Sequence, residues 1–150
     1  MAGESALAEE RFLSLLARLR KLGLGCLPFK DIPVTPPQFI LMDWVAGSPG
    51  CGIREMAIGL GLTPPTVSVG VRRLEEAGLL ARQPDPKDRR AIQLFLTSQG
   101  QALHQRVQDF RLRKVRRLLA GLTSQEQATL LGLLERALSA AEREEKEETS

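Results

Sequence analysis

The chain has 150 residues and a formal net charge of +3, a length that suits one compact unit and is short for two independent ones. Helix-forming residue types dominate, tyrosine is absent and only one short pair of strands is visible, so a mainly helical fold is expected. No apolar run is long enough to cross a membrane, and the first residues lack a basic and then apolar signal pattern. These absences predict a cytoplasmic protein with no membrane partner.

The first predicted helix carries an apolar stripe. Its members recur at the spacing of one helix face: Phe12, Leu15, Leu16 and Leu19. A second apolar helical run covers residues 39–45 and includes Trp44, which we expect in the core or in a pocket wall. Residues 47–52 are rich in glycine but lack the Lys-Ser/Thr ending of a phosphate-binding loop, so they predict a turn.

Two short helices are predicted next, over residues 53–60 and 63–78, joined by Gly61-Leu62. Thr63 caps the second helix, Pro64 suits its first position, and Gly78 supplies the residue that ends it. One apolar face is formed by Val67, Val71 and Leu74. Helices joined this closely cross steeply, as in a helix-turn-helix, whose second helix enters the DNA major groove.

The predicted DNA-binding surface lies on the other face of this second helix. It comprises Thr63, Pro65, Thr66, Ser68, Val69, Arg72 and Arg73. Cationic and hydroxyl groups can contact phosphates and base edges, and Val69 can touch a thymine methyl group. From this helix alone, an ordinary solvated face is an equally good interpretation.

Residues 79–83 and 91–96 predict two strands joined by a polar hairpin tip. The tip carries Lys87, Arg89 and Arg90, and an arginine on a projecting hairpin can enter the minor groove. We expect Asp85 and Asp88 to support the tip by orienting these arginines through charge-assisted hydrogen bonds. A catalytic role for the two carboxylates is disfavoured, because a hairpin tip offers no pocket that would shift their pKa values.

The sequence of the hairpin tip, Asp85-Pro86-Lys87-Asp88-Arg89-Arg90, is followed by Leu96-Thr97-Ser98-Gln99-Gly100. Together with the helix 63–78, these motifs resemble the multiple-antibiotic-resistance regulator (MarR) family of bacterial transcription factors. The resemblance implies a mainly α fold: a winged helix-turn-helix with a two-stranded wing at residues 35–97, and a helical dimerisation region at residues 1–34 and 98–150. Relatives often carry a basic or polar residue where this chain has Val69-Gly70, so its operator need not match theirs.

The last two helices are predicted over residues 97–120 and from a capping box at Thr123–Glu126 onward. The final helix has an apolar stripe that includes Leu130, Leu134 and Leu138. This stripe and the stripe of the first helix each provide more apolar surface than the core of one small winged helix needs. We expect these faces to form a homodimer, and the alternative is that they complete the core of a monomer.

Charge is unevenly distributed along the chain. The last nine residues hold five acids and two bases, net −3, which leaves +6 for the rest and favours a polyanionic partner. A basic run on the linking helix comprises Arg111, Arg113, Lys114, Arg116 and Arg117. Most of it is expected to be solvated, and a minority interpretation has one or two of these side chains bind an acidic ligand.

The family resemblance implies an effector, a small aromatic or acidic compound held between the dimer base and the winged helix. It also raises the possibility of oxidant sensing at Cys26, although two cysteines in a cytoplasmic protein are usually reduced and inert. His104 is the only histidine, and the cysteines lack metal-ligand spacing, so no metal and no cofactor are expected.

These features predict a homodimeric, sequence-specific transcriptional regulator of double-stranded DNA, a repressor released by an effector, with an inverted-repeat operator. The main alternative is a winged-helix protein-interaction module, since a fold does not fix a function. The cations on the second helix and on the wing argue against that module. An enzyme is the weakest interpretation, because the sequence supplies no nucleophile with a base, no metal cluster and no cofactor loop.

Overall fold

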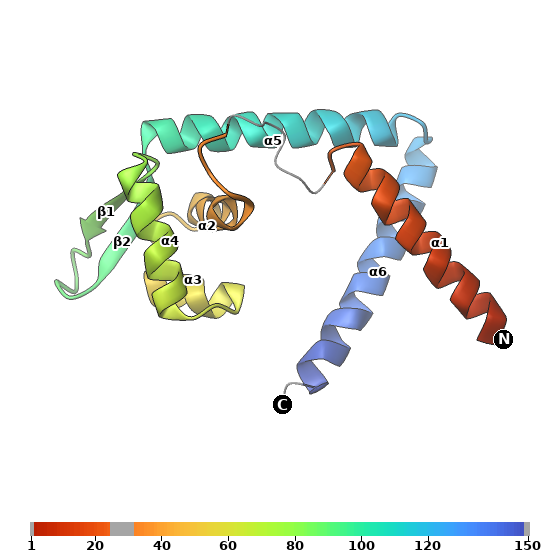
Figure 1. The fold of residues 1–150 in the computed structure, drawn as a ribbon, viewed down its shortest axis with the longest axis horizontal. Coiled ribbons are helices and arrows are strands. Elements are labelled where there is room, and N and C mark those ends of the chain that lie inside the picture. Colours follow the sequence, from red (N-terminus) through yellow and green to blue (C-terminus); the bar gives the residue numbers. More distant parts are fainter. Residues whose placement is uncertain (1, 25–31, 149–150) are drawn as a thin grey trace. The chain divides into compact units, whose positions relative to one another are not determined.

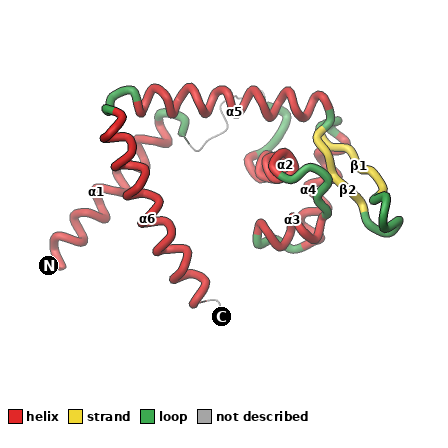
Figure 2. Tube along the Cα trace, turned by 180° about the vertical axis from the view of Figure 1, so that it is seen from behind, coloured by secondary structure: helices red, strands yellow, loops and turns green. Residues whose placement is uncertain are grey.

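A computed structural model describes residues 2–24 and 32–148 (Figures 1 and 2). Within them the chain is mainly helical, with one two-stranded antiparallel sheet. The elements are α1 (Ala2–Lys21), α2 (Pro36–Gly47), α3 (Ile53–Leu60), α4 (Pro64–Glu76), β1 (Leu80–Pro84), β2 (Ile92–Leu96), α5 (Ser98–Leu119) and α6 (Ser124–Glu148). The chain divides into two compact units, Met1–Leu112 and Arg113–Ser150, which are described separately.

The first unit contains a winged helix built on one apolar core. Helix α4 packs against α2 and α3, and α2 also contacts β2. The largest fully buried side chains of this core are Phe39, Met42, Met56, Leu74 and Leu94. The predicted apolar face of α4 is confirmed, because Val67, Val71 and Leu74 are all fully buried. The expected fold class is therefore confirmed.

Local sequence signals set the ends of α2 and α4. Thr35 and Gln38 form a capping box that starts α2, and Thr63 Oγ1 accepts a hydrogen bond from Thr66 N at the start of α4. Gly61, with φ 64°, ends α3, and Gly78, with φ 72°, follows α4. Both glycines adopt the left-handed conformation that other residues reach only at a cost, so the tight turns predicted at these positions are confirmed.

Trp44 packs against α3 at Gly59. A Cβ atom at Gly59 would lie 1.9 Å from Trp44 Cη2, so the absence of a side chain there allows the indole to approach the helix closely. The indole Nε1 atom is buried without a hydrogen-bond partner among the described residues. Core packing, one of the two roles expected for Trp44, is what the structure shows.

The hairpin pairs Leu80 with Leu96, Arg82 with Leu94 and Pro84 with Ile92. Both strands begin one residue later than the sequence predicts. Figure 1 shows the hairpin projecting from the end of α4, away from α2 and α3. This register buries Leu94 completely and leaves the polar tip outside the core.

The start of α5 is fixed to the turn between α4 and β1. Thr97 Oγ1 donates a hydrogen bond to Gly78 O at 2.6 Å and accepts one from Gly100 N at 3.0 Å. A Cβ atom at Gly100 would lie 2.1 Å from Leu79 O, so only glycine permits this approach. The Leu-Thr-Ser-Gln-Gly motif is thus the joint between the wing and α5.

Further along α5, a polar cluster joins this helix to α2. Asp43 Oδ1 accepts hydrogen bonds from His104 Nε2 at 2.8 Å and from Gln108 Nε2 at 2.9 Å. The His104 ring also stacks on Phe39, with ring centroids 5.6 Å apart. His104 therefore serves the contact between α2 and α5.

In the second unit, the capping box predicted at the start of α6 is confirmed. Thr123 N donates to Glu126 Oε2 at 2.8 Å, and Thr123 Oγ1 accepts from Glu126 N at 3.2 Å. Gln127 closes the turn between α5 and α6 by donating to the carbonyl oxygens of Leu119 and Leu122. Within the described ranges, no helix has the length and apolar character of a membrane span.

Candidate nucleic-acid interface

One side of α4 is polar and open to solvent. Thr63, Pro65, Thr66, Arg72 and Arg73 are exposed, as the sequence predicts. Val69 is 48% exposed, so an apolar side chain is accessible among these polar groups. Ser68 is only half-buried, because it flanks the face that packs into the core.

The first turn of α4 holds its hydroxyl groups in a fixed arrangement. Thr63 Oγ1 and Thr66 Oγ1 lie 2.8 Å apart in a hydrogen bond, while Thr63 also caps the helix. Each hydroxyl still has hydrogen-bonding capacity to spare. The pair can therefore present a positioned donor and acceptor to a ligand at the helix N-terminus.

A surface hollow of about 410 Å³ separates the N-terminal end of α2 from α4. Its lining consists of Thr35, Pro37, Gln38, Leu41, Leu62, Thr66, Val69, Gly70 and Arg73. A Cβ atom at Gly70 would lie 2.4 Å from Leu41 Cδ1, so Gly70 lets α2 approach α4 closely. The sequence alone does not place the start of α2 beside this surface, because only the crossing of the two helices brings them together.

The tip of the hairpin is held by its two aspartates. Asp85 Oδ1 accepts a hydrogen bond from Lys87 N at 2.8 Å, and Asp88 Oδ1 accepts one from Arg90 N at 3.0 Å. The expected mechanism is corrected here, because the carboxylates bond backbone amides and not arginine side chains. Residues two apart in a turn place the amide within reach of the carboxylate, so the support acts on the main chain.

The side chains of Lys87, Arg89 and Arg90 are exposed at the tip. Neither these cations nor Arg72 and Arg73 have an acidic partner among the residues that the structure describes. Unpaired cations on a projecting hairpin attract polyanions, since no internal charge neutralises them. Helix α4 and the hairpin belong to one compact unit, so both cationic surfaces are carried by the same part of the chain.

One link between α4 and the hairpin has no counterpart in the sequence analysis. Arg82 Nε in β1 donates a charge-assisted hydrogen bond to Glu75 Oε1 in the last turn of α4. The two residues are seven apart and belong to different elements, so neither the helix nor the strand by itself predicts their contact. Only the turn at Gly78 brings them into contact.

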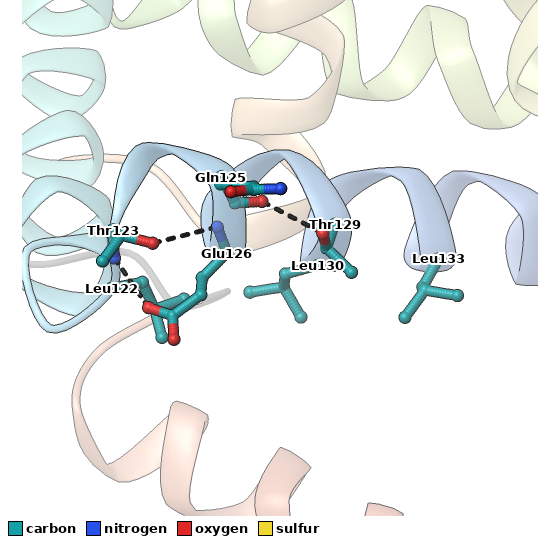
Figure 3. Close-up of a pocket in the computed structure, with 7 residues that line it drawn as sticks. All are labelled: Leu122, Thr123, Gln125, Glu126, Thr129, Leu130 and Leu133. Atoms are coloured by element: carbon teal, nitrogen blue, oxygen red, sulfur yellow. Dashed lines mark hydrogen bonds between the residues drawn. The ribbon is translucent and has the colours of Figure 1, made fainter.

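The predicted dimerisation residues fall on apolar faces that are open to solvent. Phe12 and Leu15 of α1 are exposed, whereas Leu16 and Leu19 are half-buried. On α6, Leu130, Leu134 and Leu138 are exposed. Figure 3 shows Leu130 and Leu133 on the same side of α6, where they line a hollow of about 610 Å³.

The remaining candidate residues of the sequence analysis have different environments. Burial raises the pKa of the Cys51 thiol, and the negative charge of Glu55 adds to the effect, so this thiol stays protonated and unreactive. Cys26 lies outside the described residues. The guanidinium of Arg111 lies 4.8 Å from the centroid of the Phe39 ring, a cation–π contact that engages part of the basic run of α5.

The sequence is similar to known transcriptional regulators. It is 31% identical over 103 residues to an HTH-type transcriptional repressor of Mycobacterium tuberculosis, a match that covers 69% of this chain and 74% of that protein. The identity is also 31% over 103 residues to a putative transcriptional regulatory protein of Thauera aromatica, of which the match covers 62%.

The fold is similar to solved structures over most of its length. The YusO protein of Bacillus subtilis is 28% identical, with a TM-score of 0.72 over 91% of this chain and 97% of that one. PcaV of Streptomyces coelicolor, solved in complex with its natural ligand, is 28% identical, with a TM-score of 0.58 over 90% of this chain and 91% of PcaV. Residues 32–91, from before α2 to the hairpin tip, match the MarR family. With these likenesses in sequence and in fold, the chain belongs to the MarR family.

Proposed function

We propose that this protein is a homodimeric, sequence-specific DNA-binding transcriptional regulator of the repressor type, active in the cytoplasm. The observation that carries the proposal is the pairing, on one unit, of an exposed helix face and a hairpin tip whose cations have no acidic partner among the described residues. The division of the chain into a winged-helix region at residues 35–97 and a dimerisation region at residues 1–34 and 98–150 is part of the same proposal.

Helix α4 enters the major groove in this proposal. Thr63, Thr66 and Ser68 offer hydroxyl groups, Arg72 and Arg73 offer guanidinium groups, and Pro65 and Val69 complete the surface. Val69 favours a thymine methyl group, because it is an exposed apolar side chain among polar ones. Lys87, Arg89 and Arg90 serve the minor groove and its phosphates, with Arg90 as the inserting side chain.

The dimer supplies the symmetry of the operator. The apolar faces of α1 and α6 pack against those of a second copy, because exposed leucines on a helix are stabilised by burial in a partner. Two identical α4 helices then read an inverted repeat whose half-sites lie about 10 base pairs apart. Light scattering should give the mass of a dimer at micromolar concentration, and a monomer at that concentration would contradict this part of the proposal.

A small aromatic or acidic effector controls the affinity for DNA. The relative PcaV is described in complex with its natural ligand, which supports a ligand for this chain as well. An effector that binds better to a conformation unsuited to DNA lowers the DNA affinity by population shift. Aromatic carboxylic acids should therefore both raise the melting temperature and release bound DNA. A compound that raises the melting temperature but does not release bound DNA would contradict the proposed control by an effector.

The DNA-binding proposal is tested with Arg90→Ala. Wild-type protein first selects fragments from a genomic DNA library, and fluorescence anisotropy then measures Kd for the selected site at several salt concentrations. Loss of the wing cation should cost about 1–3 kcal/mol, roughly 5- to 150-fold in Kd, and should flatten the salt dependence by about one unit of slope.

Arg143→Ala is the matched control, because it removes the same charge from α6 and not from the hairpin. Its Kd and salt slope should stay close to those of the wild type. If Arg90→Ala and Arg143→Ala have the same Kd and the same salt slope, Arg90 has no special role in DNA binding and the proposed role of the wing is refuted. If the wild type selects no site, or binds DNA without salt dependence, the protein-interaction module becomes the better interpretation.

A further inference from the structure

Glu75 and Arg82 form an ion pair across the turn at Gly78. Arg82 Nε donates to Glu75 Oε1, and the side chains are 41% and 22% exposed, respectively. Among the described residues, this is the only polar side-chain link that the structure records between α4 and the hairpin. It therefore joins the helix and the wing directly, side chain to side chain.

The position of Glu75 is unfavourable for stability. It lies in the last turn of α4, where the helix dipole disfavours a negative charge. A carboxylate close to a surface that binds phosphates also weakens that binding unless a cation neutralises it. An ion pair with this exposure adds little to the free energy of unfolding. Stabilisation of the fold is thus a poor explanation for the pair.

Geometry gives a better explanation. The connection from α4 to β1 is only three residues long and turns at Gly78, where Thr97 Oγ1 holds the backbone carbonyl at 2.6 Å. Thr97 fixes the turn itself, but it does not touch the side chains beyond it. The pair lies one step further out, where it bridges the last turn of α4 and the middle of β1.

We infer that Glu75 and Arg82 are positioning residues for DNA recognition. This inference rests on the proposed function, in which α4 reads the major groove and the hairpin tip reads the minor groove. The two grooves are a fixed distance apart on a given operator, so both contacts form together only at one wing angle. The pair holds the wing at that angle, and its effect is on selectivity and not on stability.

The test compares Glu75→Gln with Glu76→Gln. Both variants remove one negative charge from adjacent residues of α4, and the side chain of Glu76 has no hydrogen bond or ion pair within the described part of the chain. The probes are the site selected by wild-type protein and a shuffled duplex of equal composition. Glu75→Gln should lower the ratio of the two affinities about tenfold, a coupling normal for residues in one network. Glu76→Gln should keep that ratio within about twofold.

Arg82→Gln provides the second arm, because it abolishes the same ion pair while changing the net charge in the opposite direction. A charge effect alone would move DNA affinity in opposite directions in Glu75→Gln and Arg82→Gln, whereas a positioning role lowers selectivity in both. The exchange Glu75→Arg with Arg82→Glu should restore part of the selectivity. Melting temperatures of all variants should stay near that of the wild type.

Equal selectivity of Glu75→Gln, Glu76→Gln and the wild type would overturn the inference and leave the proposed function intact. A loss of selectivity that parallels a large fall in melting temperature would overturn it too, since the pair would then be structural. Failure of the wild type to select any site would overturn the proposed function, and this inference with it, before a variant is measured.

Discussion

The winged helix and α6 place their leucines in different environments. In the winged helix, Leu74 and Leu94 have no exposed surface, and they pack with aromatic and branched side chains in one core. Over the whole of α6, within Arg113–Ser150, no side chain is buried, and Leu130, Leu133, Leu134 and Leu138 are all exposed. A protein surface rarely keeps so many large apolar side chains in water without a partner. The comparison shows that the leucines of the first region are buried by the packing of their own unit, whereas those of α6 would be buried only in the dimer that we propose.

The same substitution in the two regions tests this difference most strongly. Leu74→Ala removes a fully buried side chain and should lower the free energy of unfolding by about 2–5 kcal/mol, whatever the protein concentration. Leu134→Ala should have an effect that depends on concentration, because its side chain is exposed in the single chain and would be buried only in the proposed dimer. Chemical unfolding at two protein concentrations separates the cases. A concentration-independent loss in Leu134→Ala would mean that α6 packs within its own chain.

A glycine substitution at the joint between the wing and α5 should have the next largest effect. In Gly100→Ala, the new Cβ atom meets Leu79 O at 2.1 Å, and neither the carbonyl nor the helix can move freely. The strain should cost about 1–3 kcal/mol, measured as a shift of the denaturation midpoint. Wild-type stability in this variant would show that the joint is looser than the structure indicates.

A glycine-to-alanine substitution in α6 should have the smallest effect on stability, and this effect should be stabilising. A Cβ atom at Gly132 has no neighbour within 4 Å among the described residues, and glycine inside a helix is less stable than alanine. Gly132→Ala should therefore stabilise the helix by about 0.5–1 kcal/mol. If the variant instead weakens the dimer in sedimentation or light scattering, Gly132 lies in the contact between copies, which would locate that interface more closely.

Local residue patterns predicted most of the fold. The capping residues Thr63 and Thr123, the apolar face of α4 and the turn glycines Gly61 and Gly78 were all found where their patterns indicate. Each of these signals acts over a few residues of chain, so a sequence carries it directly. Both strands start one residue later than predicted, because the limits of a hairpin depend on packing as well as on composition.

The exposed face of α4 and the charged hairpin tip could be identified from the same patterns, but their supporting contacts could not. The aspartates of the wing were expected to orient arginine side chains, and they bond the amides of Lys87 and Arg90 instead. A sequence shows that opposite charges are close along the chain, and it does not show which atoms meet. The pair Glu75–Arg82 was missed for the same reason.

The sequence by itself determined the order of helices and strands, the buried and exposed faces of α4, and the positive charge at the wing tip. These properties follow from periodicity, capping and composition, which are local. Tertiary structure decided the contacts between distant residues: Trp44 against Gly59, Gly70 against Leu41, Thr97 on the carbonyl of Gly78, and Asp43 with His104. Such contacts depend on how helices cross and turns close, because a side chain meets a distant partner only after the backbone has fixed the distance between them.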